Sequence, residues 1–225
     1  MAETVIPAPV QAVIPVQGGG LFPVRRIYCV GRNYAEHARE MGHDPDREPP
    51  FFFMKPADAI VTRGQDMPYP PATKDLHHEM ELVVALGSGG ADVAEADAMR
   101  LVWGYAAGLD MTRRDLQGEA KKLGRPWEMG KGFDHSAPIG DLVPAAGRTP
   151  GRIELRVNGQ VRQSSHVDTL IWSVPETIAY LSRLVRLEAG DLIFTGTPEG
   201  VAAVQRGDTL EGMVEGVGEV RTRVV

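Results

Sequence analysis

Glu79 and Glu81 are separated by a single residue inside an apolar, β-branched run that extends to Leu86. Such a run is typical of a buried strand, and side chains alternate between the two faces of a strand, so both carboxylates project to the same side. Two like charges held this close on a buried surface repel each other unless one is protonated or a cation lies between them. The spacing therefore indicates a divalent metal site. The alternative is a solvated face of an edge strand.

A third carboxylate, Asp110, follows the apolar run 102–109 and precedes Thr112, where a helix is expected to begin. Free backbone N–H groups and side chains converge where a strand ends beside a helix, and ligands often bind there. Oxygen atoms from Glu79, Glu81 and Asp110 would suit Mg²⁺ or Mn²⁺ and would leave coordination positions for water and a chelating substrate. The alternative is that Asp110 is an ordinary turn residue.

His37 and Glu40 lie three residues apart on a helix predicted over residues 34–41, and therefore on one face of it. A carboxylate that holds an imidazole N–H orients the ring and raises its basicity, which is how hydrolases activate water. The alternative is a surface pair without a role.

Three further patterns are compatible with anion binding. Lys131 stands between two glycines, where a loop can approach an anion closely. Thr197 belongs to a turn of hydroxyls and backbone N–H groups after an apolar strand. Arg114 and Gln117 are one helical turn apart, beyond Asp110. Exposed loop, turn and helix positions are the alternative interpretation of all three.

These side chains require a framework of short strands with few helices. Strands are predicted at residues 26–30, 51–54, 59–61, 79–86, 102–111, 153–157, 161–165, 192–195, 208–213 and 218–225. Helices are predicted at residues 34–41, 94–100, 112–123 and 173–186. Without a regular alternation of strands and helices, this order favours a β-rich α+β fold. Residues 1–22 are predicted to form an extended lead-in and residues 23–225 a single domain.

Several boundaries rest on turn and capping chemistry. Asn33 is predicted to cap the helix at residues 34–41 and Gly42 to end it. Thr112, with Asp115 three residues later, has the spacing of a capping box. A second capping box begins at Ser173, and Asn158-Gly159 predicts a type I′ hairpin.

Composition excludes some classes of protein. The 225 residues include 30 acidic and 24 basic side chains, so a net charge of −6 disfavours a nucleic-acid partner. The single cysteine, Cys29, cannot form an internal disulfide and fits a reducing compartment. No apolar run approaches the roughly 20 residues that span a bilayer. We therefore expect no membrane partner and a cytoplasmic location.

The motifs taken together resemble, in order, the fumarylacetoacetate hydrolase superfamily over residues 23–225. The matching blocks are Gly31-Arg32-Asn33-Tyr34 with His37 and Glu40, Phe53-Met54-Lys55-Pro56, His78-Glu79-Met80-Glu81-Leu82, Gly108-Leu109-Asp110-Met111-Thr112, Lys131-Gly132-Phe133, Val157-Asn158-Gly159, and Gly190-Asp191 with Thr195-Gly196-Thr197-Pro198-Glu199-Gly200-Val201. Within the superfamily, residues 21–26, 41–53 and 171–174 look like the fumarylpyruvate hydrolases of gentisate degradation. Gly130 departs from related members, which often have Ala or Ser there, and the departure leaves the chemistry intact.

The resemblance implies a mixed β-sandwich roll of the family's C-terminal-domain type, and usually a homodimer. It implies Mg²⁺ or Mn²⁺ as cofactor and a short lid helix that carries the water-activating dyad. By resemblance, the metal ligands are Glu79, Glu81 and Asp110, the catalytic residues are His37, Glu40 and Lys131, and the substrate-binding residues are Arg32, Arg114, Gln117 and Thr197.

The implied activity is metal-dependent hydrolysis of a carbon–carbon bond in a small 2,4-diketo acid, foremost fumarylpyruvate to fumarate and pyruvate. A first alternative uses the same metal site for oxaloacetate decarboxylation or for isomerisation or tautomerisation of a 2-hydroxy-dienoate. Isomerase members commonly lack the dyad, so its presence favours hydrolysis. A second alternative is a metal- or carboxylate-binding module without catalysis.

Overall fold

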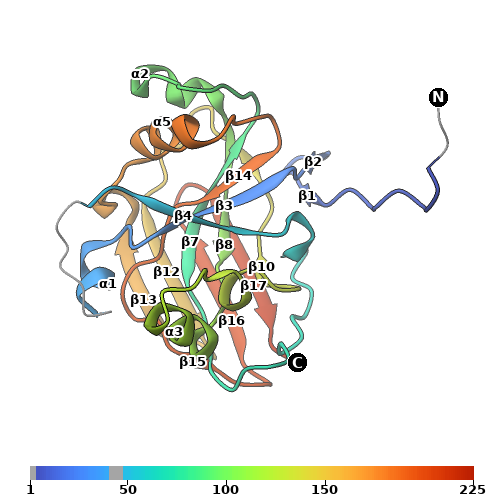
Figure 1. The fold of residues 1–225 in the computed structure, drawn as a ribbon, viewed down its shortest axis with the longest axis vertical. Coiled ribbons are helices and arrows are strands. Elements are labelled where there is room, and N and C mark those ends of the chain that lie inside the picture. Colours follow the sequence, from blue (N-terminus) through green and yellow to red (C-terminus); the bar gives the residue numbers. More distant parts are fainter. Residues whose placement is uncertain (1–3, 41–47) are drawn as a thin grey trace.

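A six-stranded mixed sheet forms the centre of the computed structural model, which describes residues 4–40 and 48–225 (Figure 1). Its strands, in spatial order, are β11 (Val143–Pro144), β8 (Val102–Leu109), β7 (Met80–Leu86), β14 (Asp191–Phe194), β3 (Arg26–Gly31) and β4 (Phe51–Lys55). The β14–β3 pair is parallel and the other pairs are antiparallel. The chain therefore crosses over between β3 and β14 instead of following a simple meander.

A four-stranded antiparallel sheet packs beneath the central one. Its strands, in spatial order, are β13 (Gln160–His166), β12 (Arg152–Val157), β16 (Thr209–Val214) and β17 (Gly218–Arg223). A three-stranded sheet joins β15 (Ala203–Val204), β6 (Leu76–His77) and β9 (Thr112–Arg113). Two small pairs join β10 (Ala137–Pro138) to β5 (Ile60–Val61) and β1 (Val13–Pro15) to β2 (Leu21–Pro23).

Short helices connect and cover the sheets. They are α1 (Ala35–Glu40), α2 (Glu95–Ala98), α3 (Arg114–Lys122), α4 (Glu128–Lys131) and α5 (Val174–Leu184), with 3₁₀ turns at Ala57–Ala59, Met99–Leu101 and Val167–Thr169. Helices α2 and α5 pack together at one end of the molecule, and α3 packs against α4 (Figure 1). Helix α4 also contacts β4 and β9, which brings it to the end of the central sheet where the acidic residues lie.

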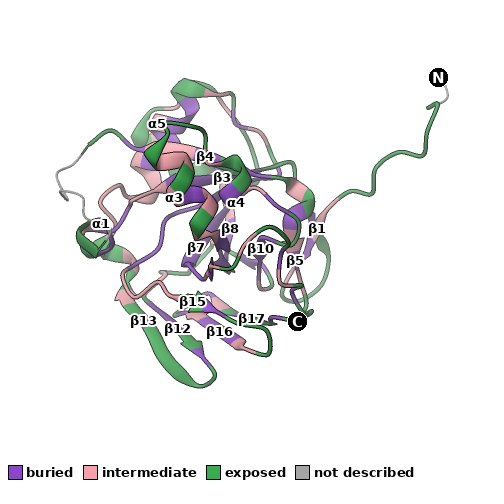
Figure 2. Cartoon of the chain, turned by 60° about the horizontal axis from the view of Figure 1, so that its bottom comes forward, coloured by how far each residue is buried: buried purple, intermediate pink, exposed green. Residues whose placement is uncertain are grey.

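Strand β7 is buried along its whole length and divides the apolar interior into two cores (Figure 2). Leu82 and Val84 face one core, which includes Leu155 of β12 between the two sheets. Val83 and Ala85 face the other core, which the N-terminal segment helps to cover. A strand buried on both faces reads as a continuous hydrophobic run, which is what residues 82–86 show.

The structure confirms the β-rich α+β fold and much of its local detail. The Asn158-Gly159 hairpin has both turn residues at positive φ, 53° and 77°, as a type I′ turn requires. Ser173 and Glu176 form the predicted capping box of α5.

Two predicted helix starts are wrong. Thr112 does not cap α3: it lies in β9, and Asp115 instead accepts hydrogen bonds from the Thr73 hydroxyl and the Lys74 N–H. Asn33 does not cap α1 either, because its side chain bonds the backbone of other segments. Gly42, the predicted end of that helix, lies outside the described residues.

The lead-in predicted over residues 1–22 is only partly extended. Residues 13–23 form the β1–β2 hairpin, and Ile14 and Phe22 are buried in the second core. Alternating apolar residues pack where the central sheet offers an uncovered face, and the Gly-rich turn at residues 18–20 allows the reversal. Val5 and Val10 project into solvent on an arm that leaves the body of the molecule (Figure 1).

Candidate active site

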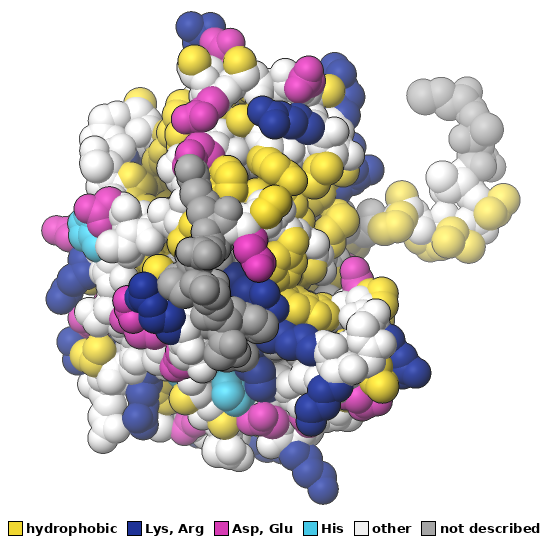
Figure 3. Space-filling model, turned by 60° about the vertical axis from the view of Figure 1, so that its left-hand side comes forward, with side chains coloured by type: hydrophobic (Ala, Val, Ile, Leu, Met, Phe, Trp, Pro, Cys, Tyr) yellow, Lys and Arg dark blue, Asp and Glu magenta, His cyan; other side chains and the backbone are white. Residues whose placement is uncertain are grey.

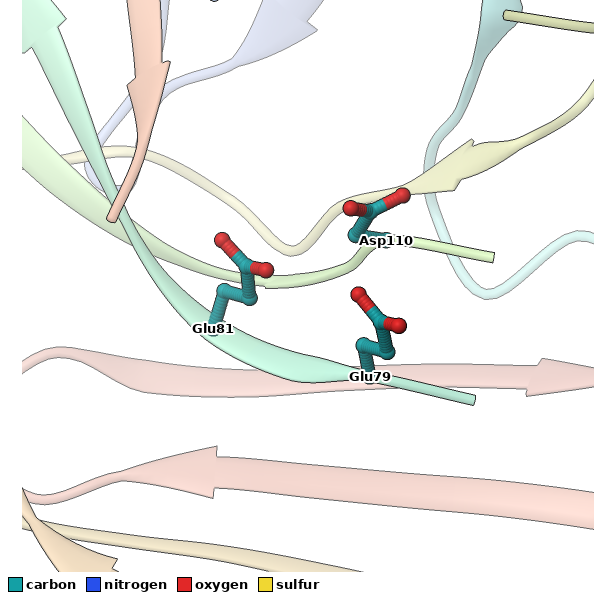
Figure 4. Close-up of side chains that lie close together, drawn as sticks. All are labelled: Glu79, Glu81 and Asp110. Atoms are coloured by element: carbon teal, nitrogen blue, oxygen red, sulfur yellow. The ribbon is translucent and has the colours of Figure 1, made fainter. Parts of the chain in front are cut away.

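Glu79, Glu81 and Asp110 gather on one face of the central sheet (Figure 4). Glu81 pairs with Gly108 in the β7–β8 register, and the Asp110 N–H donates to the Glu79 carbonyl at 2.8 Å. Glu79 and Asp110 are therefore cross-strand neighbours, with Glu81 two residues along on the same face. Ligand oxygens from the three buried carboxylates lie within 4.8 Å of one another. The i, i+2 spacing in the sequence predicted this common orientation correctly.

Three buried or half-buried cations contact these carboxylates. Lys131 Nζ donates to Glu79 Oε2 at 2.6 Å, to Asp110 Oδ2 at 2.7 Å and to the Thr112 hydroxyl at 2.7 Å. Lys55 Nζ lies 2.8 Å from Asp110 Oδ1. Arg114 donates to Glu79 Oε1 at 2.6 Å. These short charge-assisted contacts give Glu79 and Asp110 three cationic partners between them.

The two glutamates respond oppositely to this environment. Burial alone would raise the pKa of Glu79, but Lys131 and Arg114 outweigh it and hold that pKa well below its usual range. Burial and the neighbouring Asp110 and Glu79 carboxylates raise the pKa of Glu81 well above its usual range. The Gly196 N–H donates to Glu81 Oε2 at 2.7 Å and opposes that rise only in part. Glu81 is the carboxylate whose charge the protein leaves least compensated.

This donor set fits a hard divalent cation. All three ligands offer oxygen, which Mg²⁺ and Mn²⁺ prefer over nitrogen or sulfur. Asp110 Oδ1 is buried and accepts no well-aligned hydrogen bond from the described residues, although Lys55 Nζ lies close to it. That oxygen and the neighbouring glutamate with a raised pKa both gain from a cation placed between them.

Helix α1 supplies the predicted pair of His37 and Glu40. His37 Nδ1 lies 3.1 Å from Glu40 Oε2, and His37 is only 7% exposed. Burial lowers the pKa of His37, although Glu79 and Glu40 oppose that shift. The imidazole is therefore neutral near pH 7 and able to accept a proton, while Glu40 holds its other nitrogen.

Glu40 has a second contact that ties α1 to the rest of the site. The Gly200 N–H donates to both Glu40 oxygens, at 3.1 and 3.2 Å. Gly200 follows the Thr197 turn, so Glu40 joins the helix to the loop after β14. No local pattern indicated this contact, because the two residues are 160 positions apart.

One cavity brings most of the predicted residues together. It is lined by Arg32, His37, Glu79, Arg114, Gln117, Lys131 and Thr197, and also by Val30, Gly31, Phe53, Lys121 and Trp127. Its volume is about 30 Å³, room for only a few water molecules. Gln117 accepts from Arg114 at 2.7 Å, and the Thr197 hydroxyl accepts from Gln163 at 2.8 Å. The bonded partners fix both side chains in place.

Asn33 and Gly196 fix the loops around this cavity. The Asn33 amide donates to the carbonyls of Thr195 and Trp172 at 2.8 and 2.9 Å and accepts from the Trp172 N–H. Gly196 has φ of +100°, and a Cβ there would lie 2.7 Å from the Asn33 Cβ. Only glycine fits both conditions, and this backbone presents the N–H that bonds Glu81.

Sequence reasoning missed three contributors to the site. It gave no role to Lys55, Lys121 or Gln163, although Lys55 stands in one of the matching motifs. A lysine inside the apolar run 51–55 was the available signal, because a buried lysine needs a charged partner.

None of the described helices is both long and apolar enough to cross a membrane.

Comparison with known proteins gives consistent matches. The family model described as fumarylacetoacetate (FAA) hydrolase C-terminal matches residues 26–225. A fumarylpyruvate hydrolase of Ralstonia sp is 50% identical over 188 residues, which cover 82% of this chain and 98% of that protein. The mitochondrial oxaloacetate tautomerase FAHD1 of Rattus norvegicus is 45% identical over 204 residues, covering 89% of this chain and 91% of that protein.

Solved structures match over nearly the whole chain. The crystal structure of fumarylpyruvate hydrolase from Pseudomonas aeruginosa in complex with Mn²⁺ and pyruvate superposes with a TM-score of 0.97. It is 54% identical, and the match covers 99% of each chain.

Proposed function

The chain belongs to the fumarylacetoacetate hydrolase family, and from that premise we propose that it is a divalent-metal-dependent hydrolase that cleaves fumarylpyruvate to fumarate and pyruvate. The observation that carries this proposal is the placement of His37, whose ring contacts Glu40, on the wall of the cavity that also reaches Glu79 and Lys131. A base that faces a metal-binding carboxylate cluster is the arrangement that hydrolysis of a diketo acid requires.

In this proposal, Glu79, Glu81 and Asp110 hold Mg²⁺ or Mn²⁺. The ion supplies a Lewis acid where negative charge develops on the pyruvyl half of the substrate. Lys131, already bonded to two of the carboxylates, adds a positive charge at the same place. Arg32, Arg114, Gln117 and Thr197 contact the substrate from the cavity wall.

The dyad performs the proton transfers. His37, oriented by Glu40, takes a proton from water, and the water oxygen bonds to the carbonyl carbon of the acyl group. The bond between that carbon and the methylene carbon breaks, and its electron pair leaves as the enolate of pyruvate. Proton return to the methylene carbon completes pyruvate, so the net change is the addition of one water. A positioned base of this kind contributes about 100- to 10,000-fold in rate.

Helix α1 serves as the lid in this proposal. We expect α1 to open for substrate entry, because His37 of α1 forms part of the cavity wall. The contact between Glu40 and the Gly200 N–H holds α1 against the loop after β14. Glu40 thus both orients His37 and holds α1 in its closed position.

A substrate panel tests the activity directly. Protein loaded with Mn²⁺ is expected to bleach the near-ultraviolet absorbance of fumarylpyruvate and to release equal amounts of fumarate and pyruvate. Maleylpyruvate, acetylpyruvate and oxaloacetate complete the panel. Loss of absorbance without release of pyruvate from any of them would refute hydrolysis.

The relative from Rattus norvegicus supports a second candidate, oxaloacetate tautomerisation at the same metal site. Oxaloacetate decarboxylation, 2-hydroxy-dienoate isomerisation and metal binding without catalysis would use the same carboxylates. Tautomerisation moves a proton between oxygen and carbon and adds no water, so it predicts turnover of enol-oxaloacetate in wild type with no release of pyruvate, and therefore nothing for His37→Asn to stop. Hydrolysis predicts that the same substitution stops the release of pyruvate.

The proposal extends to the oligomeric state of the protein and to its location and pathway in the cell. We expect a homodimer, because the side of the molecule where β4 begins and α5 lies gathers hydrophobic side chains on its surface (Figure 3). There Phe52 and Trp172, both partly exposed, pack against Tyr180 at ring distances of 6.3 and 6.0 Å. Light scattering coupled to gel filtration measures the mass. A cytoplasmic role in gentisate-type degradation fits the free, buried Cys29.

A further inference from the structure

Two cations on the wall of the active-site cavity have no acidic partner in the described part of the chain. Lys121 and Arg32 both line the cavity, and within residues 4–40 and 48–225 neither donates a side-chain hydrogen bond or forms an ion pair. The nearest acidic influence on Arg32 is the exposed Glu48, which acts on it only through space. Arg114 and Lys131, by contrast, are both bonded to Glu79.

Helix α3 places Lys121 at a defined distance from the metal ligands. Arg114, Gln117 and Lys121 are spaced i, i+3 and i+7, so they share one face, and all three line the cavity. Seven residues of helix put the Cα atoms of Arg114 and Lys121 about 10 Å apart along the axis. Arg114 contacts Glu79 at one end of this row, and Lys121 stands at the far end.

The length of the row suits a dicarboxylate. The seven-carbon chain of fumarylpyruvate, with C–C bonds of about 1.5 Å, spans roughly 8 Å between its two carboxyl carbons. When the pyruvyl half lies at the carboxylate cluster, the carboxylate of the fumaryl half reaches the neighbourhood of Lys121. A substrate that ends in a methyl group instead of this carboxylate has no group to pair with Lys121.

Aromatic rings hold both cations in place. Lys121 Nζ lies 4.9 Å from the centre of the Trp127 ring, and the Arg32 guanidinium lies 5.4 Å from the centre of the Phe51 ring. Phe51 and Trp127 meet edge to face at 5.2 Å. The two cations are therefore fixed by one pair of touching rings, at little cost in side-chain entropy on binding.

The backbone at Arg32 is also specialised. Arg32 has φ of 55°, a left-handed conformation that non-glycine residues adopt at a cost, and such conformations cluster at ligand sites. A Cβ at Gly31 would lie 2.1 Å from the Phe51 ring, so glycine is needed for that ring to pack there. Arg32 Nε is buried and has no hydrogen-bond partner among the described residues.

The balance of charges in the cavity also favours a second bound anion. Lys55, Lys131 and Arg114 already pair with Asp110 and Glu79. A bound divalent ion, Arg32 and Lys121 then leave the cavity with an excess of positive charge. Burial and repulsion from Arg114 and Arg32 lower the pKa of Lys121 to about 8, and a second anion in the cavity relieves that repulsion.

We propose that Lys121, together with Arg32, forms the subsite for the distal carboxylate of the substrate and so selects dicarboxylic acylpyruvates over neutral ones. This subsite rests on the proposed hydrolase function, whose reaction takes place at the other end of the cavity. Lys121 and Arg32 are specificity residues here, since the bond that breaks lies nearer the carboxylate cluster.

Paired substrates test the subsite. Fumarylpyruvate and acetylpyruvate share the reacting atoms and differ at the distal end. Lys121→Met is expected to lower kcat/KM for fumarylpyruvate about 10- to 100-fold, mostly through KM, since one charge-assisted hydrogen bond is lost. For acetylpyruvate, kcat/KM should change less than about threefold. Lys121→Arg should restore most of the loss, and Arg32→Gln should act in the same direction.

Lys122→Met is the matched control. Lys122 follows Lys121 in the helix but is exposed and lies outside the cavity, so its substitution should leave both substrates unchanged. An equal loss on both substrates in Lys121→Met, or no loss on fumarylpyruvate, would overturn the subsite.

Binding without turnover separates this proposal from the proposed function. Fumarate and crotonate differ only by a carboxylate in place of a methyl group, and calorimetry on Mn²⁺-loaded protein measures both. The subsite predicts tighter binding of fumarate than of crotonate in wild type, and a smaller difference between the two in Lys121→Met, where Arg32 alone remains to hold the distal carboxylate. That result stands even if wild type fails to hydrolyse fumarylpyruvate, whereas equal binding in wild type refutes the subsite alone.

Discussion

The two ends of the active-site cavity are built in contrasting ways. At the inner end, Glu81 lies in β7, Glu79 directly precedes β7 and Asp110 directly follows β8, and Lys131 is bonded to Glu79 and Asp110. At the outer end, Arg32 and Lys121 rest on aromatic rings, and α1 is joined to the loop after β14 through Glu40. The inner end suits chemistry that requires fixed atoms, and the outer end suits selection and entry.

The largest effect of a substitution is expected at the inner end of the cavity. Glu81→Gln removes a proposed metal ligand while keeping its shape and its place beside the Gly196 N–H. We expect kcat/KM to fall by roughly 1,000-fold or more, since the Lewis acid is lost. Steady-state kinetics and Mn²⁺ titration followed by electron paramagnetic resonance check this. Full Mn²⁺ binding in the variant would remove Glu81 from the ligand set.

His37→Asn tests the next largest effect, on the lid. The substitution should lower kcat about 100- to 10,000-fold, because water loses its base. Mn²⁺ affinity should stay within about threefold of wild type, since His37 lies outside the carboxylate cluster. The same two measurements as for Glu81→Gln therefore separate the two ends, since turnover falls in both variants but Mn²⁺ binding falls only in Glu81→Gln. A joint loss of turnover and metal would contradict the division.

The outer end should also be the pH-sensitive one. Lys121 has a pKa lowered to about 8 by burial, by Arg114 and by Arg32, while Glu79 raises it and Lys131 lowers it. As pH rises through about 8, Lys121 loses its charge, so KM for fumarylpyruvate should rise up to about tenfold. Lys121→Arg should flatten this alkaline limb, and acetylpyruvate should not show it. If KM rose equally at alkaline pH in Lys121→Arg, a group other than Lys121 would be the cause.

The decline of kcat/KM at acid pH should reflect protonation of His37. Burial lowers the pKa of His37 below its ordinary 6.5, so the base stays neutral until the pH falls below that value. We expect kcat/KM to hold at pH 6.5 and to decline only at lower pH. Glu40 raises the pKa of His37 through its hydrogen bond, so Glu40→Gln should move the decline to still lower pH. A decline centred above 6.5 in wild type would contradict this.

The smallest effect concerns stability. The pKa of Glu81 is raised in the folded, metal-free protein, so its contribution to stability is present at low pH and lost as pH rises through the folded pKa. Without metal at about pH 7, Glu81→Gln should therefore raise Tm by a few degrees. Mn²⁺ should raise the Tm of wild type and leave that of the variant unchanged. Scanning calorimetry with and without a chelator checks both.

Local sequence patterns predicted contacts between residues close together in the sequence better than contacts across the fold. The i, i+2 spacing of Glu79 and Glu81 settled their common face, because strand alternation is a local rule. The i, i+3 spacing brought His37 and Glu40 together for the same kind of reason. Side-chain contacts across the fold escaped prediction: the Asn33 amide bonds Thr195 and Trp172, which are 162 and 139 positions away.

The error at Thr112 has a related cause. Its spacing to Asp115 satisfies the local rule for a capping box, but β6 pairs with Thr112, and Thr73 and Lys74 bond Asp115. Segments distant in the sequence thus bond both Thr112 and Asp115, which the predicted cap had paired with each other. Lys121 was missed because a lysine in a basic stretch of helix looks exposed until the other wall of the cavity is known.

The lysine that bridges Glu79 and Asp110 has a consequence for the life of the protein in a cell. Many small metal sites assemble only when the ion arrives, so their chains stay unfolded during a shortage. Here Lys131, Lys55 and Arg114 already pair with Glu79 and Asp110, and the raised pKa of Glu81 favours its uncharged form, so the sheet that carries them can form without an ion. A newly made chain can therefore fold first and acquire its metal afterwards. Which ion it carries would then follow the supply of the moment, and metal shortage would silence the protein without destroying it.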